Sequence, residues 1–548
     1  MRKDPPIRQC FNRKLGRALV SGASVILVLG NGFAASASEP VLDIGSRLEL
    51  FVDQYLIQRM EGVRLQLRHP RPAETAIEFD RPWEGLGSAF PVVVKDGENY
   101  HMYYRGMVWD ARTETLIEST CYAASSDGIR WSKPNLGRVE IMGTRNNNAL
   151  FDSSGFSPFL DSRPGVPPSE RFKAVKSPPR STPEVGSRIL VSGDGIHWRK
   201  LHDRPSIADG TLFWSGAENC YVAFGRSNVE LGLKIRRLAD DPASYRSLLT
   251  REGEFSILDG DRAGDDAFRF SADGGRTWKR TGVIRTVQRA VSTDLVQWSD
   301  WQTMNFSQYP PTMDEQFYTN ATQPYFRAPH LYIALAARYL PGQQALSDEQ
   351  GRSIQPEGMP WWTWKNCSDA VLLTSRGGDR YDRTFPEAFL RPGPGLENWG
   401  TRTNFPGVGI VPTAEEEMSF YVTRNYELPS DHVRRYTLRV DGFASLHAGY
   451  DGGEMVTRPL RFQGKQLVLN FSTSAAGSLR VEIQDAENHP IPGFRLDDCP
   501  ELIGDKIQQV VRWAEGSDLS RLEGRPVRLR FVMKDADLYS IRFARPQS

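Results

Sequence analysis

The chain has 548 residues with 68 basic and 67 acidic side chains, a formal net charge of +1. This balance argues against a nucleic-acid partner or attraction to an anionic membrane, because both require an excess of basic residues. Glycine and tryptophan recur between short apolar runs along the chain, which favours a repetitive, all-β protein.

Residues 1–37 are typical of a secretory leader. Six basic residues surround the start of the apolar run "ALVSGASVILVLG", and Ala35-Ser36-Ala37 forms a small-residue cleavage site. Removing this segment with its six basic residues and one acidic residue leaves 62 basic and 66 acidic residues, and four scattered cysteines. We therefore expect a secreted or periplasmic protein with no membrane attachment after cleavage, buried thiols, and no metal or other cofactor.

One signature recurs five times, in full or in a worn form: a strand, then Ser/Thr-x-Asp-Gly or a close variant, then an aromatic residue. The copies lie at 122–131, 189–198, 289–298, 372–381 and 437–446. Asp and Gly accept the backbone angles of tight hairpin turns. An apolar strand and an aromatic-rich strand precede each copy. Three strands and a closing fourth, five times over, predict an all-β, five-bladed β-propeller across residues 38–450, with an open β-sandwich as the alternative.

Two insertions interrupt the repeat, at 162–170 and at about 236–284. The second contains "SADGGRTW" (271–278), a complete Asp-box, which is a turn motif of sialidase-type propellers. We interpret this motif as a stable hairpin without a chemical role. Beyond the propeller, the alternating pattern of "KQLVLNFSTSAAGSLRVEIQD" and "GRPVRLRFVMKDADLYSIRF" predicts a β-sandwich over residues 451–548 that braces the propeller.

With this repeat, the chain resembles the five-bladed propeller glycoside hydrolases, the superfamily of arabinanases, β-xylosidases and β-fructosidases. It is most similar to a largely unassigned group of exported bacterial proteins within that likeness. The resemblance implies a carbohydrate substrate, cleaved by two carboxylates where the inner strands converge on the propeller axis. The Asp-Pro pairs of that superfamily are here Phe90-Pro91 and Ser157-Pro158. A propeller that binds a glycan without cleaving it is the alternative.

Other acids and polar residues flank the predicted inner strands and supply the candidate site. For catalysis we expect Glu315, paired with either Asp209 or Glu84. Aromatic rings suit the apolar faces of sugars, while amides and carboxylates bind their hydroxyls. The further candidates for contact with the sugar are Asp80, Asp161, Asn320, Trp399, Arg402 and Asn404.

The second strand of every predicted blade ends in a basic residue. These residues are Arg105, Lys176, Arg226, Arg338 and Arg424. In an antiparallel blade this end lies beside the start of the first strand, so the basic groups should share the face with the acids. They either pair with those acids or, as we expect for Arg105, Arg226 and Arg338, bind a uronate or sulfate ester. A sialidase-like enzyme is a third possibility, disfavoured because sialidases generally have six blades.

Overall fold

The structure is a computed structural model. It describes residues 39–545 apart from 111–114, 180–185, 207–209, 231–255, 258–267, 272–278, 282, 313, 358–361 and 401. The expected leader, the candidate Asp209 and all but the first residue of the Asp-box lie outside the described residues. Among the described residues, no helix has the length and apolar character needed to cross a membrane.

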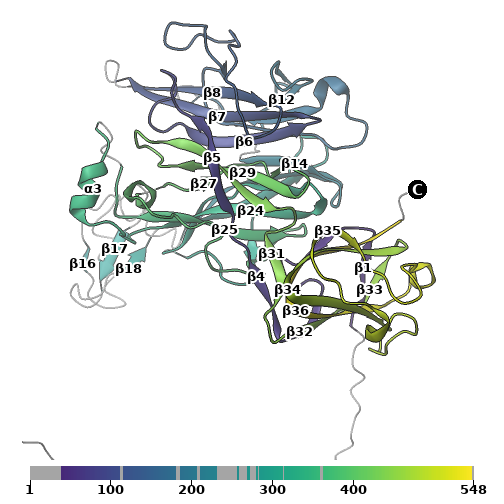
Figure 1. The fold of residues 1–548 in the computed structure, drawn as a ribbon. Helices are drawn as coiled ribbons and strands as arrows, with labels where there is room; N and C mark the ends of the chain where they lie inside the picture. Colours follow the sequence, from purple (N-terminus) through teal and green to yellow (C-terminus); the bar gives the residue numbers. More distant parts are fainter. Residues whose placement is uncertain are drawn as a thin grey trace, which may run out of the picture. The chain divides into compact units, whose positions relative to one another are not determined.

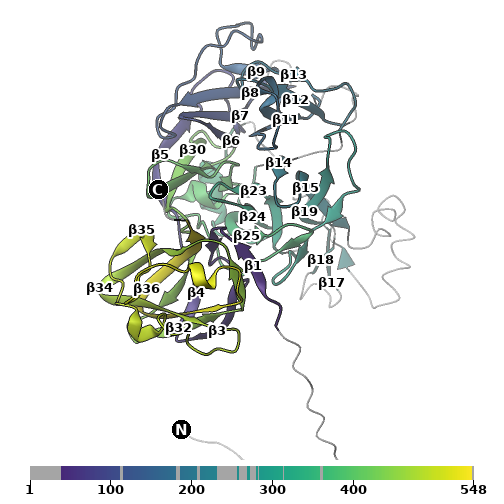
Figure 2. The same cartoon turned by 90° about the vertical axis from the view of Figure 1, so that its right-hand side faces the viewer.

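The predicted five-bladed β-propeller is confirmed, and each blade is a small antiparallel sheet (Figures 1 and 2). Blade 1 contains β6 (Ala89–Asp96), β7 (Asn99–Asp110), β8 (Thr115–Ser125) and β9 (Ala149–Phe151). Blade 2 contains β10 (Phe156–Leu160), β11 (Phe172–Lys176), β12 (Arg188–Ser192) and β13 (Arg199–Lys200). Blade 3 contains β14 (Thr211–Ser215), β15 (Cys220–Glu230), β19 (Val283–Ser292) and β20 (Gln302–Thr303).

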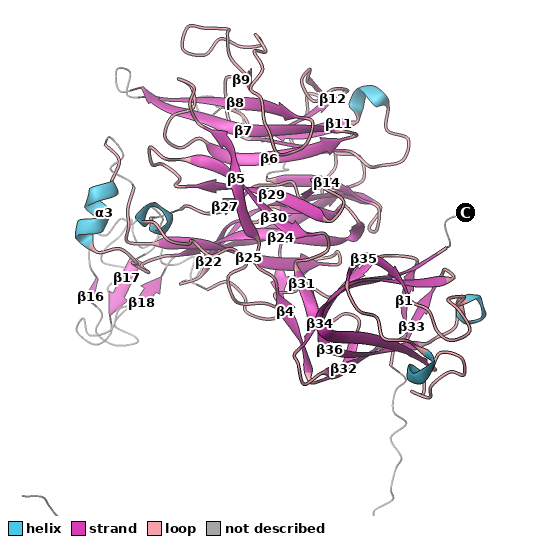
Figure 3. Cartoon of the chain, viewed as in Figure 1, coloured by secondary structure: helices cyan, strands magenta, loops and turns pink. Residues whose placement is uncertain are grey.

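The last two blades follow the same plan with two irregularities. Blade 4 contains β22 (Gln316–Thr319), β23 (Thr322–Tyr325), β24 (Ala328–Leu340) and β25 (Cys367–Ser375), and its inner strand is split into β22 and β23. Blade 5 contains β27 (Phe405–Pro406), β28 (Val411–Pro412), β29 (Glu417–Arg424) and β30 (His432–Arg439). Its outer strand is β5 (Arg71–Glu78), which comes from the N-terminal side of the propeller. Strands dominate the described chain, and α3 (Asp348–Ile354) lies between β24 and β25 (Figure 3).

The recurrent signature forms the same hydrogen-bonded turn in three blades. In blade 1 the Ser125 hydroxyl accepts from the N–H three residues later, and Asp127 Oδ1 accepts from the N–H groups two and three residues later, all at 2.8 Å. The pattern is repeated at Ser192 with Asp194 and at Ser292 with Asp294. In blade 1 this turn lies at the strand ends remote from Phe90. The signature therefore recurs because its Ser and Asp side chains stabilise the same turn in each of these three blades.

A second sheet takes its strands from both ends of the described chain, and we call it the terminal sheet. Its strands are β2 (Glu49–Leu50), β3 (Ile57–Glu61), β4 (Val63–Leu67), β31 (Ala444–Ala448), β32 (Gly453–Thr457), β34 (Gln466–Gln484), β35 (Asp505–Val510) and β36 (Arg528–Ala544). Residues 49–67, which the sequence pattern assigned to the propeller, thus pair with strands near and beyond residue 444. These residues belong to the terminal sheet because β3 pairs with β32 and β4 pairs with β31 through backbone hydrogen bonds.

The propeller and the terminal sheet share a buried polar contact at Asp441. Its carboxylate accepts hydrogen bonds from Tyr325 and Arg327 of the β23–β24 hairpin, each at 2.7 Å. It also accepts from Ser540 at 2.7 Å and from Asn470 at 3.0 Å, both in the terminal sheet. Because the carboxylate is fully buried, each of these bonds offsets part of its desolvation. The described cysteines, all free, are buried as expected: Cys121, Cys220, Cys367 and Cys499.

A buried ion cluster joins the same two parts at Glu49 of β2. One carboxylate oxygen lies 2.7 Å from an Arg376 nitrogen, and the other lies 3.2 Å from His330 Nε2. Asp53 adds a second carboxylate 3.0 Å from Arg376. Burial alone would raise the pKa of Glu49, but the neighbouring His330 and Arg376 outweigh it and lower this pKa to about 2. Folding is therefore linked to ionisation of this group.

Glu49 should make the stability of the protein fall in acid. The pKa of a glutamate in the unfolded chain is about 4.3, so the contribution of Glu49 is complete above that pH and is lost as the pH falls toward 2. We expect Glu49→Gln to lower the free energy of unfolding by about 3 kcal/mol at pH 6 and by much less at pH 3. Urea unfolding at both pH values measures this difference. Asp203→Asn, whose side chain is 94% exposed, is the control, and a Glu49→Gln effect that is independent of pH would contradict the assignment.

Candidate functional site

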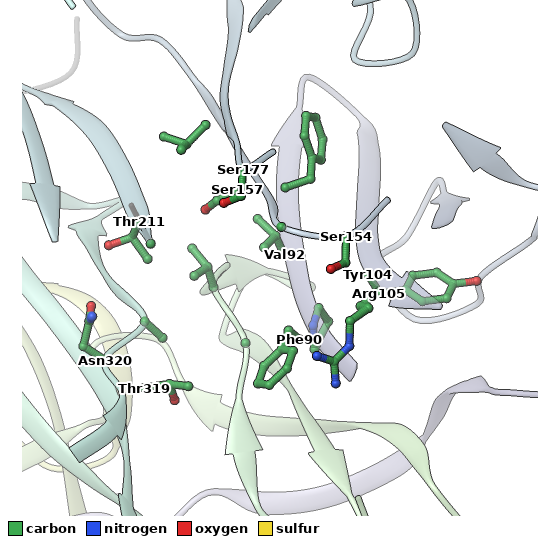
Figure 4. Close-up of a pocket in the computed structure, with 18 of the residues that line it drawn as sticks. Phe90, Val92, Tyr104, Arg105, Ser154, Ser157, Ser177, Thr211, Thr319 and Asn320 are labelled. Atoms are coloured by element: carbon green, nitrogen blue, oxygen red, sulfur yellow. The ribbon is translucent and has the colours of Figure 1, made fainter. Parts of the chain in front are cut away.

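The blades meet around a cavity of about 440 Å³, which we call the axial cavity. It lies where the inner strands of the blades begin, and all five blades contribute to its wall (Figure 4). The lining residues are Phe90, Pro91, Val92, Tyr104, Arg105 and Thr120 from blade 1, 154–157, Val175 and Ser177 from blade 2, Gly210, Thr211 and Arg226 from blade 3, 318–321 from blade 4, and 406–408 from blade 5.

Hydroxyl and amide groups form much of the polar surface of this wall. Thr211 and Asn320 lie across the cavity from Phe90 and Arg105 (Figure 4). The Asn320 Oδ1 accepts hydrogen bonds from the N–H and the hydroxyl of Thr322, at 3.0 and 2.8 Å, so its Nδ2 remains the donor for a ligand. Among the described residues that line the cavity there is no Asp or Glu. The wall is therefore suited to hydroxyl groups and to negative charge.

An aromatic stack forms one side of the cavity. Phe90 is stacked on Phe405 with ring centroids 5.6 Å apart, and Phe405 is stacked on Tyr318 at 5.0 Å. The Arg105 guanidinium lies 4.7 Å from the Phe90 ring centre, and that of Arg285 lies 5.0 Å from Tyr318. Phe90 and Tyr318 reach the cavity, and cation–π contacts of this kind contribute about 0.5–1 kcal/mol each, more when desolvated.

The backbone is irregular at two points of the cavity wall. Phe90 has a φ of 60° and Ala321 a φ of 45°, so both non-glycine residues adopt left-handed conformations. Phe90 lies in a register shift between β6 and β7, and Ala321 lies between β22 and β23. Such conformations cost about 1–2 kcal/mol per residue and persist where the surroundings fix them. At Phe90 the irregularity coincides with an aromatic residue in the cavity wall.

Among the described residues, Arg338 is the one member of the predicted basic ring that is bound by carboxylates. Arg338 forms a two-pronged ion pair with Asp369 at 2.7 and 2.6 Å, and Glu315 lies 3.7 Å away. Burial raises the pKa of Asp369, although Arg338 opposes the shift. Arg338 does not line the axial cavity, so its predicted role in binding the sugar is not supported by its position.

The other basic residues are bound by neutral groups or face the cavity. Arg105 donates to the Gly87 carbonyl oxygen and, at 2.6 Å, to the Tyr426 hydroxyl. Lys176 is buried and donates to the Ser154 carbonyl oxygen at 2.6 Å, and burial lowers its pKa to about 8. Arg424 donates to the Pro392 carbonyl oxygen and to Asn398. Arg226 is exposed to the cavity, and it has no hydrogen-bond or ion-pair partner among the described residues.

Glu315 lies just before β22, whose continuation toward β23 lines the cavity. Its carboxylate forms an ion pair with Arg383 and lies beside Arg338. The side chain is 28% exposed. Glu315 is thus partly accessible, although it is not among the residues that line the cavity.

Glu84 and Asp80 lie together beside blade 1, away from the cavity lining. Glu84 is buried, accepts from the Tyr104 hydroxyl at 2.6 Å and pairs with Lys133 at 2.5 Å. Asp80 pairs with the same Lys133 at 2.8 Å, a contact that lowers the pKa of Asp80. These contacts give Glu84 a role in anchoring the segment before β6. Asp161 is equally remote, because it follows the far end of β10 and is buried against Lys173 at 2.8 Å.

Three further candidates lie in the segment before β27. Trp399 donates to the Gly393 carbonyl oxygen at 3.0 Å, and the buried Asn404 donates to the Ser368 carbonyl oxygen at 2.8 Å. Arg402 lies 3.4 Å from Glu427 and hydrogen-bonds Tyr318; burial alone would lower the pKa of Arg402, but the Glu427 charge raises it. Asn404 shapes the loop, whereas Arg402 holds a residue of the aromatic stack. Among the described residues, no three His, Cys, Asp or Glu side chains are grouped to hold a metal ion.

The sequence analysis missed one carboxylate near the cavity, that of Glu118. Its Oε2 accepts from the Ser154 hydroxyl at 2.9 Å, and Ser154 lines the cavity. Glu118 lies in β8 opposite Met107 of β7. Glu118 does not precede an inner strand in the sequence, so the pattern that identified the other acids does not include it. Its position follows from the strand pairing within blade 1.

Glu84 and Asp80 should differ in their effect on stability although both contact Lys133. We expect Glu84→Gln to lower the free energy of unfolding by about 3–5 kcal/mol, because it leaves a buried lysine without its buried partner. Asp80→Asn should cost at most about 1 kcal/mol, since the Asp80 side chain is 58% exposed. Urea unfolding of both variants at neutral pH measures the two effects. Equal costs would contradict the anchoring role of Glu84.

No protein-family model and no curated protein matches the chain. Similar solved structures include a glycoside hydrolase (10% identity, 68% of this chain and 92% of that chain, TM-score 0.37). Another is an N-acetylgalactosamine deacetylase from F. plautii in complex with blood group B trisaccharide (10% identity, 69% of this chain and 96% of that chain, TM-score 0.37). A third is the Bombyx mori GH32 β-fructofuranosidase BmSUC1 (10% identity, 85% of this chain and 95% of that chain, TM-score 0.33). Glycoside hydrolases, the class that the sequence resembles, are thus among the similar structures. A likeness at this level carries no argument about activity, which has to come from the site itself.

Proposed function

We propose that the protein binds a carbohydrate in the axial cavity and acts on it as an exported glycoside hydrolase. The observation that carries this proposal is the composition of the cavity wall, which combines the aromatic residues Phe90 and Tyr318 with hydroxyl groups and the Asn320 amide. Sugars have apolar ring faces and hydroxyl edges, and they need both kinds of surface. A volume of about 440 Å³ is within the usual range of small-molecule sites. The leader-like residues 1–37 support action outside the cytoplasm.

Hydrolysis needs two carboxylates beside the bond to be cleaved. One protonates the leaving oxygen, and the other attacks the anomeric carbon or activates a water molecule. Asp209 directly precedes Gly210, which lines the cavity, and Glu315 lies at the same edge of blade 4. We assign the pair to Asp209 and Glu315, with Glu118 as the competitor of Glu315 because of its bond to Ser154.

The second candidate function is glycan binding without cleavage. It is favoured by one observation: the described lining of the cavity includes Phe90 and Ser157 but no Asp or Glu. In this case the cavity would hold the sugar through its rings and hydroxyl groups alone.

Glycan binding should depend on the aromatic stack. We expect Tyr318→Ala to weaken binding by about tenfold, because it removes an aromatic ring from the cavity wall and breaks the aromatic stack. Calorimetric titration with a panel of plant and algal oligosaccharides measures the affinity. Tyr450→Ala, which removes a ring that is 65% exposed in the terminal sheet, should leave it unchanged. Equal losses in both variants, or binding of no glycan by the folded wild type, would contradict the proposal.

Hydrolysis should depend on the assigned carboxylates. We expect Asp209→Asn and Glu315→Gln each to reduce kcat by at least about 100-fold, because proton transfer in the transition state is lost, while binding is retained. A loss of kcat in Glu118→Gln but not in Glu315→Gln would assign the second carboxylate to Glu118. Asp203→Asn is the control. Product release is measured by chromatography. Binding by the wild type without any product would instead establish the second candidate function.

A further inference from the structure

We propose that the sugar in the axial cavity carries a negatively charged group, a carboxylate or a sulfate ester, and that Arg226 binds it. The inference rests on the proposed function, because it concerns the ligand of the same cavity. It goes beyond that function by naming the chemical class of the ligand and the residue that selects it.

The first argument is the environment of Arg226. It lies on β15 opposite Val287 of β19, is exposed, and lines the cavity. No acidic partner of Arg226 is found in the described part of the chain. By contrast, Arg289 of the same blade is paired with Glu218 at 2.7 Å. A guanidinium is always ionised at physiological pH, so Arg226 brings positive charge to a wall whose described lining residues include no Asp or Glu.

The second argument is the charge of the groups around it. Arg285 lies diagonally from Arg226 on the same face of the β15–β19 pair, because the strands pair Arg226 with Val287 and Asn228 with Arg285. Arg105, across the cavity, has its hydrogen bonds to a carbonyl oxygen and a phenol, which leave its charge intact. Arg105 and Arg226 are the charged residues of the described lining, which contains no Asp or Glu.

The chemistry of the guanidinium then selects the ligand. Its planar fork donates two parallel hydrogen bonds, which fit the paired oxygens of a carboxylate or a sulfate. Thr211 and Ser157 of the wall are suited to the hydroxyl groups of the same sugar. An acidic saccharide would bring a counter-ion to Arg226, which a neutral saccharide does not supply.

The test compares acidic glycans with neutral counterparts of the same backbone. The probes are galacturonan oligosaccharides with their methyl esters, and sulfated galactan oligosaccharides with their desulfated forms. Calorimetric titration at low salt gives the affinities of wild type, Arg226→Gln and Arg226→Lys. Arg130→Gln removes the same charge from a side chain that is 91% exposed, on the blade 1 turn remote from Phe90, and is the matched control.

We expect the wild type to bind an acidic member at least about tenfold more tightly than its neutral counterpart. Arg226→Gln should abolish this preference and leave neutral binding within twofold, Arg226→Lys should keep part of it, and Arg130→Gln should keep all of it. The two acidic arms distinguish a uronate from a sulfate ester.

Two results would overturn the inference and leave the proposed function intact. One is a wild type that binds the neutral members as tightly as the acidic ones, and the other is an Arg226→Gln variant that loses both members equally. Failure of the folded wild type to bind any member, including the neutral glycans, would overturn the proposed function itself. Circular dichroism of each variant excludes misfolding as the cause of a loss.

Discussion

One antiparallel ribbon holds this structure together, because it closes the propeller and joins it to the terminal sheet. The strand pair β5–β30 completes blade 5, and the chain then continues on both sides into the pair β4–β31. The Arg68 N–H donates to the Phe443 carbonyl oxygen at 2.9 Å between the two pairs. The ribbon unites segments more than 350 residues apart in the sequence, and closing so long a loop costs entropy that only the completed ring offsets. Asp441, at the bend of the ribbon, binds groups from both parts.

Closure of the ring also forms the wall of the axial cavity. It brings the inner strands of blades 1 and 5 side by side, where the Val93 N–H donates to the Val408 carbonyl oxygen at 2.8 Å and the Val408 N–H donates to that of Pro91 at 3.1 Å. The approach is so close that a Cβ at Gly407 would lie 2.1 Å from the Pro91 carbonyl oxygen. The left-handed backbone at Phe90 lies at this junction, and the closure that fixes it thereby positions the aromatic stack.

The distribution of charge follows from burial. Glu84 and Asp161 are buried against Lys133 and Lys173, because an acid removed from water needs a cation beside it. Their charges are therefore used to fix the segment before β6 and the far end of β10. Arg105 is bound by neutral acceptors and keeps its charge near the cavity. The charged residues of the described cavity lining are therefore the cations Arg105 and Arg226, which favour a negatively charged ligand.

The blades follow from the sequence, because each hairpin is a local unit whose Ser-x-Asp turn makes its own hydrogen bonds, as at Ser125 and Asp127. The predicted basic strand ends hold for Lys176 of β11 and Arg424 of β29, whereas β7, β15 and β24 continue past Arg105, Arg226 and Arg338. The folded chain, in contrast, places β5 in blade 5 and residues 49–67 in the terminal sheet. It also leaves Glu84 and Asp161 outside the cavity lining, whereas Arg226 belongs to it. These outcomes depend on pairing between distant segments and on which charges find a buried partner. Neither is encoded in the spacing of neighbouring residues.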